Sequence, residues 1–316
     1  MQTGVLVRCD LRMTLVTPPD DAVRVPSPLR RNLWLIVFGA GAAVWLVAAV
    51  VTEVTEDTIL VPNVIILGSF LVPICTVLFV LGRPGETHLR LETLLLGFLA
   101  GGTIGTVFSA GIEIWLLPDH VATNIGVGLI EEGSKALIVV GIAQFVVGRM
   151  PRDGMVLGMT VGAGFAAFES SGYALRALIE SVDQRSVIRI LETEINRAVL
   201  APFGHLTWTA LMGGALFASA RSTGRIRVDV GVALTFVGVM LLHGFWDQST
   251  GWAIRVSEGL GGEGWTFGWP DLAAWVGSPT GADLIRFHLA YSGLVVVNSL
   301  IGLTWALHRW RAYRSG

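Results

Sequence analysis

Residues 32–52, NLWLIVFGAGAAVWLVAAVVT, contain no charged side chain over 21 consecutive positions. A run of about 20 such residues is long enough for an α-helix to cross the hydrocarbon core of a bilayer. The same character extends along the chain, since 53% of the 316 residues are hydrophobic, 15% are charged and the mean hydropathy is +0.66. The sequence therefore predicts an all-α, polytopic membrane protein and excludes a soluble globular domain.

Apolar runs of similar length recur, and we expect about eight transmembrane helices. Their approximate limits are 32–52, 58–82, 92–117, 121–147, 154–179, 198–220, 229–248 and 287–308. Residues 1–31, which hold four prolines and five arginines, are expected to form a flexible cytoplasmic tail. Residues 32–316 are expected to form a single transmembrane helical domain.

The distribution of arginine predicts how these helices are oriented. Three short connections, 83–91, 148–153 and 221–228, carry two or three Arg each, whereas 53–57 and 118–120 carry neither Lys nor Arg. Short positively charged loops stay on the cytoplasmic side of a membrane. We therefore expect the N- and C-termini both to lie in the cytoplasm.

Two longer connections are expected on the outer side. In 186–199 apolar residues recur every four positions, which predicts an amphipathic helix on the membrane surface; they are Val187, Leu191, Ile195 and Val199. Residues 249–286 hold four tryptophans and eight glycines, a composition typical of an irregular loop at the membrane interface.

The composition also excludes several classes of function. The net charge of −2, without a basic stripe, argues against a nucleic-acid partner. Two cysteines, Cys9 and Cys75, cannot build a disulfide framework or a cysteine-rich metal cluster. The chain has no internal repeat and no inverted half-repeat of the kind found in secondary transporters.

Ionisable residues inside the predicted spans point to the function. The only lysine of the chain, Lys135, follows Glu131 and Glu132 within Gly-Leu-Ile-Glu-Glu-Gly-Ser-Lys at 128–135. A charged side chain at the centre of a bilayer costs about 2.5–3.5 kcal/mol on insertion scales, so each one is a candidate functional residue. The next three predicted spans add Glu169, His205, His243 and Asp247.

The spacing of these residues predicts which of them share a helix face. Glu131 and Lys135 are four residues apart and can pair, whereas Glu132 is turned by about 100° toward a neighbouring helix. His243 and Asp247 are also four residues apart, so the carboxylate can hold the imidazole in one tautomer.

The predicted depth of the same residues indicates a cavity. Counting about 1.5 Å per residue from the predicted span ends places them roughly 7–15 Å below the outer surface. Helices that run in opposite directions thus bring their polar groups to one level. This arrangement favours a water-filled cavity that opens outward.

Carboxylates packed at this depth favour acid–base chemistry. Like charges in a medium of low dielectric constant cannot all ionise, so a proton is shared between them. One carboxylate can then take a proton from water while imidazole N–H groups stabilise the oxyanion of a tetrahedral intermediate. The reaction that fits this set is hydrolysis of a peptide bond by an activated water.

The order of these motifs resembles the PrsW family of membrane proteases, which is similar to the wider superfamily of CAAX prenyl endopeptidases and bacteriocin-processing enzymes (CPBP). The motifs are Glu-Glu-x-x-Lys at 131–135, Phe-x-x-x-Glu at Phe165 and Glu169, then His205, then His-x-x-x-Asp at His243 and Asp247. The resemblance covers about residues 90–250, which would form the catalytic core.

The resemblance implies a glutamic-type intramembrane endopeptidase that requires no cofactor and no metal. Glu131 would activate water, Glu132 and its counter-ion Lys135 would lie beside it, and Glu169, His205, His243 and Asp247 would complete the catalytic set, with Phe165 in support. The substrate would be a single-pass membrane protein, such as an anti-sigma factor cut in its outer segment. The location would be the bilayer of a bacterial cytoplasmic membrane.

Three other functions are open to this sequence. The same carboxylates and histidines offer enough donors for Zn²⁺, which would make the protein a zinc-dependent membrane protease, although the sequence has no His-Glu-x-x-His helix. Buried Glu and Lys could also form the relay of a proton-coupled transporter. A third interpretation is a non-enzymatic membrane protein that holds a partner helix.

Overall fold

The computed structural model describes residues 27–83, 87–117, 123–146, 148–180, 186–221, 224–257 and 281–314. These residues form helices joined by turns and contain no strand, which confirms the all-α prediction. In chain order the helices are α1 (Ser27–Thr55), α2 (Val61–Leu81), α3 (Leu91–Ala100), α4 (Thr106–Leu116), α5 (Thr123–Ala143), α6 (Pro151–Glu180), α7 (Ser186–Leu200), α8 (His205–Ala220), α9 (Val230–Ser257) and α11 (Gly281–Ala312).

Five stretches are long and apolar enough to cross a membrane, as judged over the described residues. They are Arg31–Thr55, Thr58–Leu81, Leu91–Leu116, Val230–Ser257 and Gly281–Ala312. The other predicted spans correspond to α5, α6 and α8, which carry Glu131, Glu132, Lys135, Glu169 and His205. The protein is therefore an integral membrane protein, and the total of eight spans stays a prediction.

Several boundaries differ from those expected. α1 begins at Ser27, within the predicted tail, and the remainder of that tail lies outside the described residues. α9 continues to Ser257, well beyond the predicted end at residue 248, and α11 begins at Gly281. Most of the predicted tryptophan-rich loop, including Trp265, Trp269 and Trp275, also lies outside the described residues.

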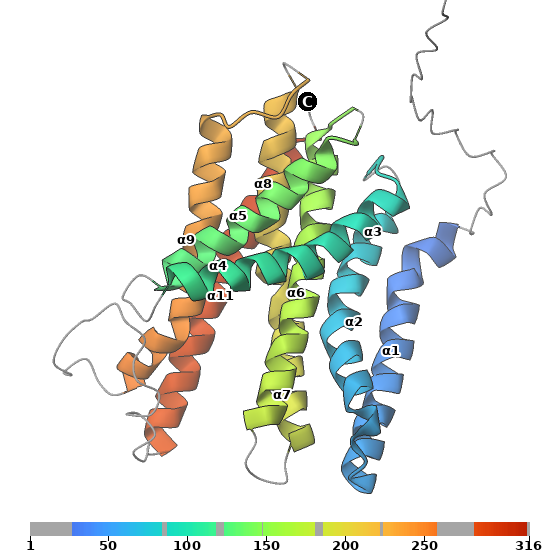
Figure 1. The fold of residues 1–316 in the computed structure, drawn as a ribbon, viewed down its shortest axis with the longest axis vertical. Helices are drawn as coiled ribbons and strands as arrows, with labels where there is room; N and C mark the ends of the chain where they lie inside the picture. Colours follow the sequence, from blue (N-terminus) through green and yellow to red (C-terminus); the bar gives the residue numbers. More distant parts are fainter. Residues whose placement is uncertain are drawn as a thin grey trace, which may run out of the picture.

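α6 is the central helix, with α1 and α2 on one side and α9 and α11 on the other (Figure 1). α3 and α4, joined by a π-helical turn at Gly101–Gly105, cross α6 obliquely. Glycines on both elements allow this crossing, because a side chain at Gly101 would meet the Val161 carbonyl and one at Gly164 the Phe98 carbonyl. α5 then runs back at an angle to α6, carrying the Glu-Glu-x-x-Lys motif.

α6 and α8 also approach each other at backbone distance. A side chain at Gly158 would overlap the Thr209 carbonyl, and one at Gly162 the His205 carbonyl. Gly154 and Gly213 face each other in the same way, each against the carbonyl of the other. Small residues at helix contacts are what close packing in a membrane requires.

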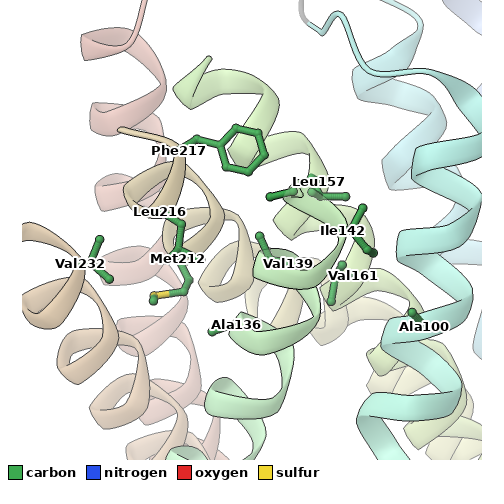
Figure 2. Close-up of a cluster of buried hydrophobic side chains, with 11 residues drawn as sticks. Ala100, Ala136, Val139, Ile142, Leu157, Val161, Met212, Leu216, Phe217 and Val232 are labelled. Carbon is green, nitrogen blue, oxygen red and sulfur yellow. The ribbon is translucent and has the colours of Figure 1, made fainter. Parts of the chain in front are cut away.

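Apolar side chains close the bundle on the side of α5 that follows Lys135. Ala136, Val139 and Ile142 of α5 meet Leu157 and Val161 of α6 there (Figure 2). Met212, Leu216 and Phe217 of α8 and Val232 of α9 complete the cluster. The polar residues of α5 therefore have a dry, packed layer at one end.

α7 is the helix expected at 186–199. It packs against α2 and α6, with Val187, Ile190 and Glu194 buried, while Ile195 and Val199 are exposed. Of the four apolar residues at the four-residue spacing, Val187 and Leu191 therefore pack inward and Ile195 and Val199 face outward, and the inward face also carries Glu194. A 3₁₀ turn at Ala201–Phe203 joins α7 to α8, so the predicted span 198–220 is broken next to Gly204.

The close contact of α6 with α8 predicts a steric effect of substitution. Gly158→Val should destabilise the protein by about 1–3 kcal/mol, because the added atoms must displace the backbone at Thr209. The measurement is the thermal unfolding midpoint of the protein in detergent. Gly141→Val on α5 is the matched control, since a side chain there meets no atom within 4 Å. Equal midpoints for the two variants would contradict this packing.

Candidate active site

Lys135 is the centre of the polar cluster on α5. Its Nζ lies 2.7 Å from Glu132 Oε1 and 3.2 Å from Glu131 Oε2. The lysine side chain has no exposed surface, and both carboxylates are buried. The predicted pairing with Glu131 is present, and the shorter contact is with Glu132. One ammonium thus faces two carboxylates.

His205 connects Lys135 to α6. Its Nδ1 lies 2.8 Å from Lys135 Nζ, and its Nε2 lies 3.0 Å from Glu169 Oε2. Because an ammonium can only donate, Nδ1 must accept the hydrogen bond from Lys135. Nε2 therefore carries the ring hydrogen and donates to Glu169. This chain of contacts fixes the neutral tautomer of His205.

His243 on α9 contacts three carboxylates. Its Nδ1 lies 3.0 Å from Glu132 Oε1, and its Nε2 lies 3.4 Å from Asp247 Oδ2 and 3.7 Å from Glu131 Oε2. From the four-residue spacing we expected Asp247 to orient the His243 ring. The hydrogen-bonded carboxylate is instead Glu132, which leaves Nε2 facing Glu131 and Asp247.

Aromatic rings hold the cationic and imidazole groups in place. Lys135 Nζ lies 4.0 Å from the centre of the Phe165 ring, and the Phe165 and His205 ring centres are 5.3 Å apart. Trp208 packs on the other histidine, with its ring centre 4.9 Å from that of His243. Phe165 therefore supports the site by a cation–π contact as well as by packing.

The structure adds Arg197, which sequence reasoning assigned to a surface helix. Arg197 of α7 forms an ion pair with Glu169, and its Nε donates to Ser170 Oγ at 2.7 Å. Its guanidinium also lies 4.3 Å from the centre of the Tyr173 ring. Glu169 is therefore held by both Arg197 and His205. Arg197 lies eight residues before His205 in the sequence. The two side chains meet at Glu169 because α7 packs against α6.

Trp208 and the pair Asn124–Gln248 were also not singled out from the sequence. Asn124 Nδ2 donates to Gln248 Oε1 at 2.6 Å and so links α5 to α9 beside the cluster. Trp208 follows His205 by one helical turn. Its position within Gly-His-Leu-Thr-Trp-Thr at 204–209 was the available signal.

A cavity of about 810 Å³ gives access to this cluster. Glu131, Glu169 and Asp247 line it, whereas Glu132 and Lys135 lie behind them. Glu113 of α4 also lines the cavity. All eight residues singled out from the sequence thus lie in one cluster or around one cavity, and Glu131 is the member of the double glutamate that the cavity reaches.

The donor set resembles a metal site in part. Glu131, His205 and His243 each offer one ligand atom, and these atoms lie within 4.8 Å of one another. Two histidines and a glutamate are a known catalytic zinc set, and zinc-bound histidines have the second ring nitrogen on a carboxylate or carbonyl. Both histidines here have that contact, to Glu169 and Glu132. However, the Lys135 ammonium already contacts His205 Nδ1 and Glu131 Oε2.

Residues 27–270 match the PrsW family, described as intramembrane metalloproteases. The chain belongs to this family. The resemblance drawn from the four motifs is thereby confirmed, and the match covers α1 to α9 but not α11. Comparisons with curated proteins and with solved structures found no match. Family membership makes the protein an intramembrane protease, while the roles of the individual residues stay predictions.

The buried ion cluster predicts the effect of removing its cation. Lys135→Met should destabilise this PrsW-family protein by about 3–5 kcal/mol, because two buried carboxylates would lose their counter-ion. Thermal unfolding in detergent measures the effect, and Arg189→Met, which breaks an exposed pair with Glu192, is the control. The double variant Glu132→Gln, Lys135→Met should recover part of the loss. A double variant with the summed loss of its two single variants would show that the two residues are not coupled.

Proposed function

We propose that the protein hydrolyses a peptide bond in a membrane-protein substrate with a water molecule activated by Glu131. The observation that supports this role is the position of Glu131 at the wall of the cavity, with Glu132 and Lys135 behind it. Only a carboxylate in contact with the cavity can meet both water and the substrate carbonyl. Glu132 instead uses Oε1 to contact Lys135 and His243, and its Oε2 is buried without a hydrogen-bond partner among the described residues.

The proposed reaction has two steps. Glu131 takes a proton from water while the water oxygen bonds to the carbonyl carbon, giving a tetrahedral intermediate with a negatively charged oxygen. Glu131 then delivers the proton to the amide nitrogen, and the C–N bond breaks to leave an acid and an amine. General acid–base catalysis of this kind contributes about 10²–10⁴-fold to a rate.

The histidines are proposed to act on the charge that develops. His243 Nε2 faces the cavity carboxylates Glu131 and Asp247, so a protonated His243 would donate from Nε2 to the oxyanion. Glu169 is already engaged by Arg197 and His205, and we assign it to holding His205 rather than to exchanging a proton with water. Asp247 would orient the attacking water or His243.

A zinc-dependent hydrolysis is the second candidate, because the ligand atoms of Glu131, His205 and His243 lie close together. A bound Zn²⁺ would supply Lewis acidity and lower the pKa of its water. In the described arrangement the Lys135 ammonium contacts two of those three ligand atoms. This contact is why we favour the metal-independent reaction, in which Lys135 is the cation of the site.

The substrate that we propose is a single-pass membrane protein cut in its outer segment, with an anti-sigma factor as the first one to examine. The cavity lies toward the α6 end at Glu180, which the arginine distribution assigns to the outer side. A bacterial cytoplasmic membrane is the corresponding location. The proton-coupled transporter and the non-enzymatic binding protein are the functions that the experiment below would favour if no cleavage is seen.

The test compares protein N-termini by mass spectrometry in membranes that contain wild-type protein or Glu131→Gln. We expect new N-termini within the outer segments of single-pass proteins for the wild type, and a loss of at least about 100-fold for Glu131→Gln. Glu92→Gln, which removes an exposed carboxylate from the first turn of α3, is the matched control and should behave as the wild type. Identical N-termini for wild type and Glu131→Gln at equal expression would overturn the protease assignment.

The same comparison decides between the two reactions when it is repeated with a strong chelator. Cleavage that survives the chelator supports the metal-independent mechanism. Cleavage that is lost with the chelator and returns with added Zn²⁺ supports the zinc site at Glu131, His205 and His243.

A further inference from the structure

Gly172 differs from the other glycines of α6. Side chains at Gly158, Gly162 and Gly164 would strike the backbone of a neighbouring helix, so close packing explains those glycines. A side chain at Gly172 would meet no atom within 4 Å. Glycine inside a helix costs about 1 kcal/mol relative to alanine, and contacts among the described residues do not account for it at this position.

Gly172 lies on the cavity wall, in a row that runs from the closed end to the mouth. Phe165, Glu169, Gly172 and Arg176 all line the cavity and follow one face of α6 at spacings of four, three and four residues. The exposed fraction rises from 1% for Phe165 to 20% for the Glu169 side chain and 70% for that of Arg176. At 1.5 Å per residue, the row is roughly 16 Å long.

On α9, which also lines the cavity, the exposed fraction of the side chains rises in the same direction. On α9 the side chain of His243 is 2% exposed and that of Asp247 25%, and Thr250 follows them along the cavity. Tyr291 of α11 lines the cavity as well. An extended polypeptide advances about 3.3 Å per residue, so roughly five residues span the length of the α6 row.

We propose that Gly172 is a specificity-determining residue, over which the substrate passes in extended form with its backbone against α6 on the way to Glu131. This inference rests on the proposed protease function. The missing side chain leaves room between Glu169, at the reaction centre, and Arg176, at the mouth, where Tyr173 also lines the cavity. A bulky residue at Gly172 narrows the path one helical turn away from Glu169.

The first test substitutes the glycine and measures Glu131-dependent cleavage by the comparison of N-termini. Gly172→Phe should lower cleavage by about tenfold or more, and Gly172→Ala should stay within about twofold of the wild type. Gly141→Phe is the matched control, because it adds the same ring to a helix glycine with open space outside the cavity. Wild-type cleavage by Gly172→Phe would overturn the proposal.

The second test adds the bulk only after the protein has folded. Gly172→Cys should cleave nearly as the wild type does, and a charged, water-soluble methanethiosulfonate reagent should then suppress cleavage by forming a mixed disulfide. A reducing agent should restore it. The wild type, which has Cys9 and the buried Cys75, is treated in parallel and should be unaffected. Full activity of the modified Gly172→Cys protein, with modification verified by mass, would overturn the proposal.

The two proposals fail in different ways. If the wild type shows no Glu131-dependent cleavage, the protease function is wrong. If the wild type cleaves and the Gly172 variants cleave equally well before and after modification, the function stands and the substrate follows another path.

Discussion

The ion pair of Lys135 with Glu131 and Glu132 is the interaction on which the rest of the structure depends. Burying charges is expensive unless each is paired and hydrogen-bonded, and here one ammonium contacts two carboxylates, one imidazole and one aromatic ring. Each of these contacts requires a helix in a defined place. His205 must be the first residue of α8, Phe165 must lie on the facing side of α6, and α9 must bring His243 to Glu132.

Glycine makes that geometry possible, because the helices that carry the site approach one another at backbone distance. Gly158 and Gly162 let α8 lie on α6, which puts His205 within reach of both Glu169 and Lys135. The break at Gly204 serves the same purpose. It turns the chain between α7 and α8, so that Arg197 and His205 approach Glu169 from two different helices. Stability and chemistry therefore depend on the same contacts, and the packed apolar layer after Lys135 separates the cavity from the other end of the bundle.

The two glutamates of the motif have different environments although they are adjacent in sequence. A turn of about 100° per residue sends Glu132 toward α9 and leaves Glu131 at the cavity wall. The cation between them fits a metal-independent site, and the spacing of Glu131, His205 and His243 fits a metal site. The metal-independent mechanism and the zinc-dependent mechanism use the same residues, so the position of Lys135 is the feature that distinguishes the two mechanisms.

Sequence alone predicted the all-α membrane class, the family and the candidate ionisable residues, because hydropathy, helical spacing and motif order can all be read along the chain. Glu131, Glu132, Lys135, Glu169, His205, His243 and Asp247 were all identified in this way. Tertiary structure decided the partners: Glu132 rather than Asp247 hydrogen-bonds His243, and Arg197 of α7 pairs with Glu169 of α6. Periodicity shows which residues share a face but not what that face meets, since lipid and protein neighbours are equally apolar. The opening at Gly172 likewise exists only between helices that are distant in sequence.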